Sequence, residues 1–214
     1  VVVVGGAGDS EKNQSMAGAC TLAGAGALYG GAGRVYLHVL DRKAPRTNPV
    51  LPELMYRQVA DLNLQTITAV CGCGGGKAVV AHISELLTDC KQVVLDADAL
   101  NAIAADPALA TLLQYRAQMS WQTVLTPHPL EAARLLGKPD ASEVQADRLK
   151  AARDLVKRFN CVVVLKGSGS LIAGPGMSCR INTTGNGRLA TAGVRLPASG
   201  DEAEIGRASC RERV

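Results

Sequence analysis

Residues 162–170 read VVVLKGSGS, four apolar residues that end in a lysine and a glycine-serine turn. An apolar run without polar alternation is typical of a strand buried on both faces, as in a parallel sheet covered by helices. The chain that leaves the carboxyl end of such a strand lies where open α/β sheets bind ligands. Gly167 and Gly169 allow backbone N–H groups to turn toward an anion, and Lys166 adds a positive charge. The stretch therefore predicts a phosphate-binding turn, with an ordinary surface turn as the alternative.

The same pattern, a buried strand followed by a polar or glycine-rich turn, recurs along the chain. It is found at 1–4, 66–71, 92–96 and 123–125, and segments of helical periodicity lie between most of these strands. Repetition of strand and helix in this order predicts an α/β fold with a parallel sheet and helices on both faces. Because crossovers between parallel strands are right-handed, the turns at the carboxyl ends should share one edge of the sheet.

Other segments complete the expected fold. Residues 34–39 predict a further strand, residues 52–57 a short helix and residues 142–159 one long amphipathic helix. Residues 170–173 and 177–181 predict a hairpin turned at Gly-Pro-Gly.

The helix expected at 16–31 is small and apolar on nearly every side. Interior glycines destabilise a helix by about 0.5 to 1 kcal/mol each relative to alanine. This composition therefore predicts close backbone approach, either to the sheet or to a ligand.

Composition limits the class of protein. The chain has 214 residues, enough for one α/β domain or two small ones, and its 47% hydrophobic and 3% aromatic content with 23 glycines is typical of an α/β enzyme. A net charge of +4 without a basic stripe makes nucleic acid an unexpected partner. No apolar run reaches membrane-spanning length, and nothing resembles a signal peptide. The seven cysteines are scattered, and Cys71 and Cys73 form the one close pair, so reduced thiols in a cytoplasmic protein are expected.

Three polar residues follow buried strands closely enough to suggest a role. Asp98 precedes an apolar-periodic run and is predicted to cap a helix. Asp96, at the tip of its strand, is a candidate for binding a ligand hydroxyl or a metal-bound water. His128 lies between two prolines, which fix the direction of its side chain, and a functional role for this imidazole is favoured.

Seven segments together resemble one family. They are GGAG at 5–8, AGAC…GGAG across 17–33, CGCGGG at 71–76, LDADALN at 95–101, TPHPLEAARLLG at 126–137, LKGSGS at 165–170 and NTTGNGRLATAG at 182–193. The set resembles the ADP-dependent NAD(P)H-hydrate dehydratases of the ribokinase-like superfamily, and TPHPLE followed by the KG turn and TTGN is specific to them. The resemblance implies a ribokinase-like three-layer sandwich, with a mainly parallel central sheet and helices on both faces.

The resemblance also implies a nicotinamide-nucleotide repair activity. Such enzymes dehydrate (S)-NADHX and (S)-NADPHX to NADH and NADPH, and use ADP, or ATP in some relatives, to phosphorylate the added hydroxyl before phosphate leaves. Mg²⁺ is the implied metal cofactor. The substrate-binding residues implied are Ala19, Gly76 and His128, and the nucleotide-binding residues implied are Lys166, Gly167, Ser168, Gly169, Ser170 and Asn186. A structural role is the alternative for each of them.

The resemblance is interrupted after Gly193. The family continues there into a G-[TS]-G-D turn, whose backbone amides form an anion hole and whose aspartate is the catalytic base. This chain continues with VRLPA before Ser199, Gly200 and Asp201. Two interpretations stay open. Either five residues are inserted, so that Gly200 binds nucleotide and Asp201 is the base, or the reading frame changes after Gly193 and Asp201 is a coincidence.

The end of the chain favours the second interpretation. Residues 204–214, EIGRASCRERV, resemble the translation of a sequencing adapter. We therefore expect a ribokinase-like dehydratase domain at 1–193, incomplete at both ends, a divergent or frame-shifted segment at 194–203 and an artefactual tail at 204–214. A fragment of this kind could be inactive.

Two further functions stay open. One is a ribokinase-like small-molecule kinase, against which the double-proline clamp of His128 speaks. The other is a nucleotide-binding fragment without activity, which loss of the aspartate turn would produce. A nicotinamide dehydrogenase is disfavoured, because no G-x-G-x-x-G follows the first strand with an acidic residue at the end of the next. The protein is expected to be a homo-oligomer, and an epimerase domain fused before Val1 is compatible with the bifunctional members of the family.

Overall fold

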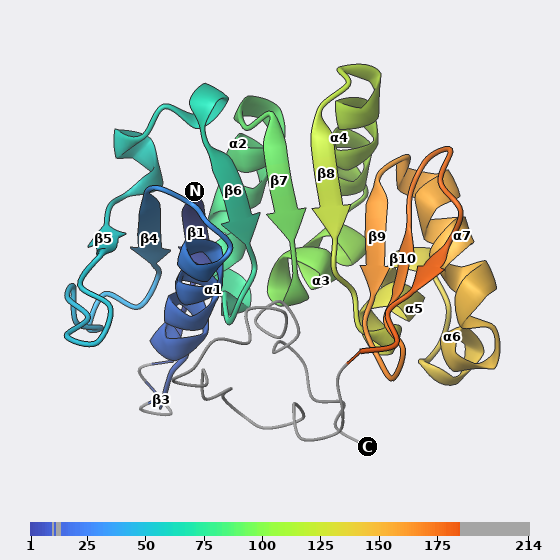
Figure 1. Ribbon diagram of the computed structural model, residues 1–214, viewed down its shortest axis with the longest axis horizontal. Coiled ribbons are helices and arrows are strands. Elements are labelled where there is room, and N and C mark those ends of the chain that lie inside the picture. Colours follow the sequence, from blue (N-terminus) through green and yellow to red (C-terminus); the bar gives the residue numbers. More distant parts are fainter. Residues whose placement is uncertain (10, 12–13, 185–214) are drawn as a thin grey trace.

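The computed structural model describes residues 1–9, 11 and 14–184, which form a nine-stranded sheet with helices packed against it (Figure 1). The strand order is β11-β10-β9-β8-β7-β6-β1-β4-β5. The strands are β1 (Val2–Gly5), β4 (Val35–Val39), β5 (Leu54–Tyr56), β6 (Thr68–Cys71), β7 (Gln92–Leu95), β8 (Gln122–Leu125), β9 (Val162–Leu165), β10 (Leu171–Ala173) and β11 (Arg180–Ile181). Two more, β2 (Gly8–Asp9) and β3 (Gln14–Ser15), form a separate ladder.

In the spatial order of the sheet, all neighbours from β9 through β6 and β1 to β5 pair in parallel. At the edge, β10 pairs antiparallel with both β9 and β11. The predicted mainly parallel α/β sheet is therefore confirmed, and so is the hairpin that follows residue 170. A parallel sheet needs apolar residues on both faces of its strands, which is why its central strands read as unbroken apolar runs.

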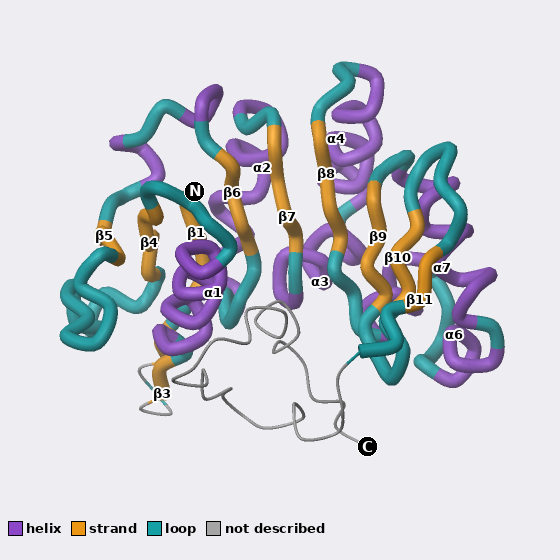
Figure 2. Tube along the Cα trace, in the orientation of Figure 1, coloured by secondary structure: helices purple, strands orange, loops and turns teal. Residues whose placement is uncertain are grey.

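The helices lie on both faces of the sheet (Figures 1 and 2). They are α1 (Ala17–Tyr29), α2 (Val80–Asp89), α3 (Ala97–Ala105), α4 (Pro107–Gln118), α5 (Pro129–Leu136), α6 (Ser142–Ala146) and α7 (Arg148–Phe159), with short 3₁₀ helices at Val59–Asp61, Leu64–Thr66 and Gly76–Val79. The crossover from β1 to β4 runs toward one edge of the sheet, and those from β6 to β9 run toward the other. Right-handed crossovers therefore put α1 on the face opposite α2 to α7.

One apolar cluster lies on each side of the sheet. The larger one joins α2 to α7 to the sheet, and the smaller one joins α1 to β1, β4 and β5. Within α1, a Cβ added at Gly24 would lie 2.6 Å from Leu37 Cδ2, so the glycine allows the helix to pack tightly on the sheet. Close packing on the sheet is thus the reason for this glycine. None of the described helices has the length and hydrophobicity that a membrane crossing requires.

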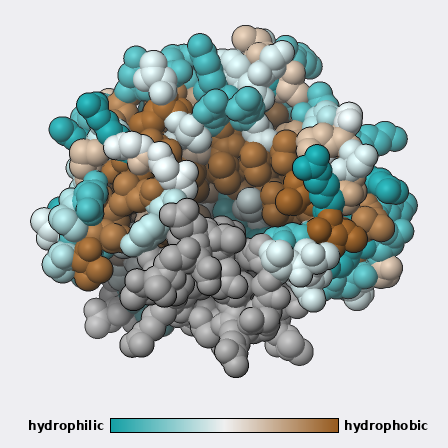
Figure 3. Space-filling view, in the orientation of Figure 1, coloured by the Kyte–Doolittle hydropathy of each residue, from teal (hydrophilic) through white to brown (hydrophobic). Residues whose placement is uncertain are grey.

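One row of apolar side chains on the α1 face is only half covered. The strand register places Val70, Val94, Val124 and Val162 side by side, and each is half-buried. We call these four residues the valine row. Of the helices that the structure describes, α1 is the one that packs on this face, over β1 and β4. Figure 3 shows apolar residues across the middle of the same face.

Two predictions about local structure are wrong. The short helix expected at 52–57 is the strand β5, whose Leu54 is buried beneath α1. The long helix expected at 142–159 is broken at Asp147, whose side chain accepts a hydrogen bond from the Lys150 N–H at 2.8 Å and so caps α7. An aspartate at this position satisfies the free N–H groups of a new helix better than it continues an old one.

Candidate functional site

The loops that follow β1, β6, β7, β8 and β9 lie at one edge of the sheet, where the arrowheads of Figure 1 end. Backbone hydrogen bonds join neighbouring loops. The N–H of Ala7 donates to the carbonyl of Gly74 at 2.7 Å, and the N–H of Lys166 donates to the carbonyl of Pro127 at 2.8 Å. The shared edge predicted from the strand pattern is confirmed, and the loops are held in fixed positions relative to one another.

A buried ion pair lies at the centre of this edge. Lys166 Nζ is 2.5 Å from Asp96 Oδ1, although the two residues are far apart in sequence. The hydroxyl of Thr126 donates to the same carboxylate oxygen at 2.8 Å, and the Cys73 thiol lies 3.8 Å from its other oxygen. Asp96 is only 4% exposed. A carboxylate so deeply buried persists because it is paired and hydrogen-bonded, and its partners fix the direction of the lysine.

The helix that Asp98 was predicted to cap begins differently. Asp96 holds the N-cap position of α3 but makes no side-chain cap, because its carboxylate is used by Lys166 and Thr126. Asp98 instead accepts a hydrogen bond from the Gly76 N–H at 2.8 Å. The prediction of an Asp98 cap is therefore wrong, and the residue fixes the glycine loop that follows β6.

Glu131 and His128 form a reciprocal cap at the start of α5. His128 Nδ1 accepts from the N–H of Leu130 at 3.1 Å, and Glu131 Oε2 accepts from the N–H of His128 at 2.9 Å. His128 Nε2 lies 3.2 Å from Glu131 Oε1, and Lys166 Nζ lies 3.8 Å from Glu131 Oε2. His128 and Lys166 thus contact the same carboxylate on the same side of the sheet. We call Asp96, Thr126, His128, Glu131 and Lys166 the strand-end cluster.

Burial controls the protonation of this cluster. Burial raises the pKa of Glu131 to about 7, against the opposing effect of the Lys166 charge. Burial also lowers the pKa of His128, and the positive charges of Lys166 and Arg134 act in the same direction. His128 is therefore held as a neutral imidazole whose Nδ1 accepts and whose Nε2 donates, as its contacts require.

The glycine loop after β6 is shaped for close approach. Gly72 has φ +119°, and a Cβ there would lie 1.8 Å from the carbonyl oxygen of Asp96. Gly74 has φ +59°, and a Cβ there would lie 3.0 Å from Cβ of Ala19, on the first turn of α1. Gly76, with φ +52°, is exposed two residues further on. The structure therefore brings Ala19 and the loop of Gly76 together, and their contact with a substrate stays a prediction.

The turn after β9 has the conformation that its glycines allow. Gly167 has φ +141° and Gly169 has φ +65°, which residues with a side chain rarely adopt. Ser168 is exposed and Ser170 is half-buried, and the Ser170 hydroxyl donates to the Gly167 carbonyl at 3.2 Å. The turn lies at the same edge as the strand-end cluster, where the sequence predicts phosphate binding.

Arg148 supports this turn, and the sequence analysis missed it. Its guanidinium donates to the carbonyls of Ser168 at 2.6 Å, Lys166 at 3.3 Å and Leu165 at 3.4 Å. An arginine at the first position of a helix is placed unfavourably in the helix dipole. That placement at the start of α7 is the one feature of the sequence that could have suggested a specific role.

Glu131 is a central member of the site, and the sequence analysis did not single it out. Its three-residue spacing from His128, which is that of a capping box, could have indicated it. Asn186, Gly200 and Asp201 lie outside the described residues, so their roles stay predictions. Among the residues that the structure describes, no three His, Cys, Asp or Glu side chains form a group that could hold a metal ion by themselves.

Comparisons with known proteins agree with this geometry. A family model described as NAD(P)H-hydrate dehydratase matches residues 1–200. An ADP-dependent (S)-NAD(P)H-hydrate dehydratase of Neisseria meningitidis is 38% identical over 200 residues, which cover 90% of this chain and 64% of that relative. The crystal structure of the ADP/ATP-dependent NAD(P)H-hydrate dehydratase of Bacillus subtilis, co-crystallised with ATP and Mg²⁺ and soaked with CoA, matches with a TM-score of 0.65 and 27% identity, over 89% of this chain and 67% of that one.

A ribokinase-like superfamily protein of Enterococcus faecalis has a TM-score of 0.64 at 20% identity, over 89% of this chain and 65% of that one, which shows a common fold. The sheet and its helices on both faces thus define an α/β protein with the ribokinase-like fold. The chain belongs to the NAD(P)H-hydrate dehydratase family. It spans just under two thirds of the length of the Neisseria relative.

Proposed function

We propose that the protein dehydrates (S)-NADHX and (S)-NADPHX to NADH and NADPH with an adenine nucleotide as co-substrate. The observation that carries the proposal is the strand-end cluster. In it Lys166, the predicted nucleotide ligand, and His128, the predicted substrate ligand, contact the two oxygens of the buried Glu131 carboxylate. This arrangement, in a member of the hydrate dehydratase family, supports the proposal of two adjacent binding sites at one edge of the sheet.

The chemistry needs both sites because hydroxide is a poor leaving group. The hydroxyl oxygen of the hydrated nicotinamide attacks the terminal phosphorus of ADP, the bridging P–O bond breaks and AMP leaves, while the hydroxyl proton passes to a base. The C–O bond then breaks, inorganic phosphate leaves and the neighbouring ring carbon loses its proton. The balance is hydrated dinucleotide plus ADP giving reduced dinucleotide, AMP and phosphate. The protein contributes mainly position and charge, as in other phosphoryl transfers.

Each described residue has a definite part in this proposal. Lys166, directed by Asp96, supplies a positive charge beside the phosphates, and the turn from Gly167 to Ser170 supplies backbone N–H groups. His128, fixed by its cap, presents its ring to the hydrated dinucleotide next to the loops of Ala19 and Gly76. The neutral imidazole can contact an uncharged ring without drawing the phosphates toward it.

Mg²⁺ fits the described residues only with additional ligands. Asp96 supplies one carboxylate at the nucleotide side, and Mg²⁺ commonly takes one or two carboxylates together with substrate phosphates and waters. Bound there, the ion would neutralise charge on the phosphates. Asn186 is proposed to assist at this position.

The base is the part of the proposal that depends on residue 201. If the five residues after Gly193 are an insertion, Asp201 receives the hydroxyl proton and Gly200 contacts the nucleotide. If the reading frame changes there, the chain binds nucleotide without turnover. A homo-oligomeric state is proposed as well.

The test is to supply the protein with (S)-NADHX, ADP and Mg²⁺ and to follow the absorbance of reduced nicotinamide. Recovery of NADH with one AMP and one phosphate per turnover supports the proposal, and the reaction should stop when ADP is left out. Accumulation of a phosphorylated dinucleotide would instead identify a small-molecule kinase. Binding of ADP without either product would identify a nucleotide-binding fragment.

A further inference from the structure

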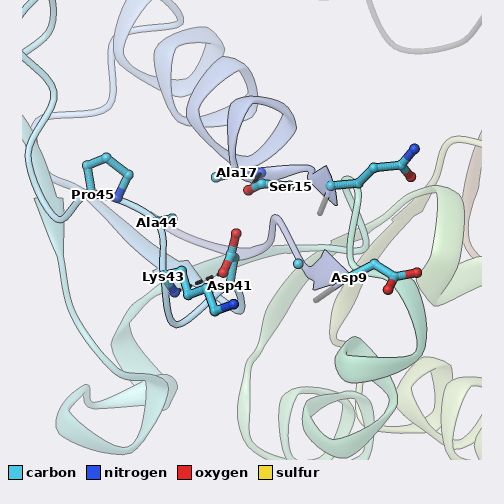
Figure 4. Close-up of a pocket in the computed structure, with 9 residues that line it drawn as sticks. Asp9, Ser15, Ala17, Asp41, Lys43, Ala44 and Pro45 are labelled. Atoms are coloured by element: carbon cyan, nitrogen blue, oxygen red, sulfur yellow. Dashed lines mark hydrogen bonds between the residues drawn. The ribbon is translucent and has the colours of Figure 1, made fainter. Parts of the chain in front are cut away.

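A cavity of about 250 Å³ lies at the same edge of the sheet, beyond β6 on the side of β1 and β4 (Figure 4). Its walls come from the β2–β3 ladder, the first turn of α1 and the loop that follows β4. Gly8, Ser15, Asp41 and Lys43 are among the residues that line it. Sites for whole small ligands usually enclose about 300 to 1,000 Å³. A cavity of this size suits one part of a dinucleotide rather than the whole molecule.

The cavity is built from a β-α-β unit with an acid after its second strand. β1 leads through a glycine turn into α1, and β4 follows in parallel beside β1. Asp41 comes two residues after β4, and its backbone N–H donates to the Gly6 carbonyl at 2.9 Å. In dinucleotide-binding sheets an acid at this place accepts hydrogen bonds from ribose hydroxyls. The acid that the sequence analysis did not find at the end of the second strand is Asp41.

The Asp41 carboxylate lies over the glycine turn. A Cβ added at Gly8 would lie 2.6 to 2.8 Å from its three carboxyl atoms, so a side chain there would displace the carboxylate. Asp41 Oδ1 accepts from the Lys43 N–H at 2.9 Å. A hydrogen bond with the Ser15 side chain, followed by the Lys43 N–H, lowers the pKa of Asp41, so the group is an ionised acceptor at neutral pH. Its direction is thereby fixed toward Ser15, as Figure 4 shows.

The cavity has one acidic and one basic side chain, and each suits a different form of the dinucleotide ribose. The carboxylate of Asp41 can accept hydrogen bonds from a ribose diol, and it disfavours a phosphate at the same place. The exposed Lys43 lines the same cavity and can pair with a phosphate on that ribose. A site with this pair of side chains can therefore hold the adenosine ribose of either form of the dinucleotide.

Resting on the proposed function, we propose that this cavity binds the adenosine ribose of the hydrated dinucleotide, with Asp41 accepting from the ribose hydroxyls and Lys43 pairing with a 2′-phosphate when one is present. The nicotinamide end then extends along the edge toward His128, over the loops of Ala19 and Gly76. Asp41 stabilises the binding of the dinucleotide without a 2′-phosphate, and Lys43 stabilises the binding of the dinucleotide that carries one.

Two substitutions separate these roles. Binding of NADH and of NADPH to the full chain is measured by calorimetry with ADP at saturation, so that the adenine-nucleotide site is filled. Asp41→Asn keeps the shape of the side chain and should weaken NADH roughly tenfold, because a hydrogen bond to a charged group is lost. It should not weaken NADPH, because the charge that disfavours a 2′-phosphate is removed. Lys43→Ala should weaken NADPH roughly tenfold and leave NADH unchanged.

The chain offers a matched control for each of these two substitutions. Asp140 accepts hydrogen bonds from the Ser142 N–H at 2.8 Å and hydroxyl at 2.5 Å, in a loop between α5 and α6, so Asp140→Asn removes a similarly bonded charge away from the cavity. Arg42→Ala removes an exposed cation next to Lys43 that does not line the cavity. Neither control should change the ratio of NADPH to NADH affinity.

The outcomes separate this proposal from the proposed function. If the protein dehydrates (S)-NADHX but Asp41→Asn and Lys43→Ala do not change the NADPH to NADH ratio, the cavity proposal is overturned and the proposed function stands. If no dehydration occurs but both substitutions shift the ratio as stated, the cavity binds the ribose and the proposed function fails. Displacement of NADH by ADP, or no binding of NADH or NADPH at all, would overturn the cavity proposal as well.

Discussion

Lys166 is the residue at which the two proposed ligands meet. Its ammonium contacts Asp96 closely and Glu131 at 3.8 Å, and His128 contacts the other oxygen of Glu131. We expect Lys166→Ala to weaken ADP binding about ten- to a hundredfold, since a hydrogen bond to a charged group contributes roughly 1.5 to 3 kcal/mol. The affinity for NADH should change much less. Calorimetric titration of each ligand measures both, and Lys150→Ala, which removes an exposed lysine paired with Asp154, is the control.

His128 is expected to contribute to the binding of NADH and not to that of ADP. His128→Ala also removes the cap of α5, which costs about 1 kcal/mol of stability. His128→Asn keeps an N-cap acceptor, so any loss that remains in this variant reports the binding role of the ring. We expect His128→Asn to weaken NADH several-fold and to leave ADP unchanged in the same titrations. Equal losses for both ligands in the Lys166 and His128 variants would contradict the division of the site.

Glu131 gives the strand-end cluster a pH dependence. Its pKa is raised to about 7 in the folded protein, chiefly by burial, so the folded state holds a proton that the unfolded chain has lost between about pH 4.5 and 7. The stability contributed by this proton is complete below pH 4.5 and is lost as the pH rises through 7. Glu131→Gln should therefore gain stability relative to the unmodified protein over this range, by up to about 3 kcal/mol.

Denaturant unfolding at a series of pH values measures this gain. The exposed Glu53 provides the control, because Glu53→Gln removes a carboxylate that is not buried in any cluster. A stability difference between Glu131→Gln and the unmodified protein that stays constant from pH 4.5 to 7 would show that Glu131 is ionised throughout.

At the residue scale, sequence reasoning found what lies at strand ends and missed what is bonded across them. Asp96 and Lys166 follow a buried strand directly, and His128 lies in the short loop after another, so their place at one edge follows from topology. Arg148 reaches the same edge from the start of α7, and only the folded turn shows that its guanidinium supports the carbonyls of that turn. Such contacts depend on distances in the folded chain, which the spacing of residues in the sequence does not determine.

At the scale of elements, Arg116 attaches α4 to the opposite end of the sheet. It is 1% exposed, and its guanidinium donates to the carbonyls of Cys90 at 2.6 Å and Leu87 at 2.7 Å and to the Thr123 hydroxyl at 2.9 Å. Arg116→Met would leave these buried acceptors without partners. We expect a loss of about 3 kcal/mol or more in the free energy of unfolding.

Denaturant unfolding measures this loss, and Arg153→Met is the matched control, because Arg153 is exposed on α7. The control should change stability by less than about 0.5 kcal/mol. Similar values for both variants would mean that water replaces the guanidinium without cost.

Element boundaries were predicted least well where a polar side chain decides them. Residues 142–159 have one continuous apolar periodicity, so pattern alone predicts one helix. The hydrogen bond from Lys150 N–H to Asp147 ends that periodicity at a single residue and starts α7 anew. At β5 the opposite happens, since pairing with β4 overrides a weak local helical tendency. Capping and strand pairing are both decided by contacts, and a periodicity does not distinguish them.

At the scale of the whole molecule, the sheet has unequal faces. The residues that face α2 to α7, such as Val93, Leu125 and Val163, are at most 2% exposed, whereas the valine row on the other face is half-buried. The sequence could not show this difference, because strands buried on both faces and strands half-buried on one face read alike when valine fills both sides. It could show only that the strands carry apolar residues on both sides.

This inequality predicts different responses to the same substitution on neighbouring strand positions. Val163→Thr buries a hydroxyl in the larger apolar cluster and should cost about 1 to 3 kcal/mol of unfolding free energy, whereas Val124→Thr in the valine row should cost less than about 1 kcal/mol. The valine row should also bind a dye such as ANS, because a contiguous, partly exposed apolar surface can do so, and Val94→Thr with Val124→Thr should lower the fluorescence of the dye. If the dye does not bind, or if the two threonines cost the same, the row is covered as well as the opposite face. In that event the sheet is closed on both sides, as parallel sheets generally require.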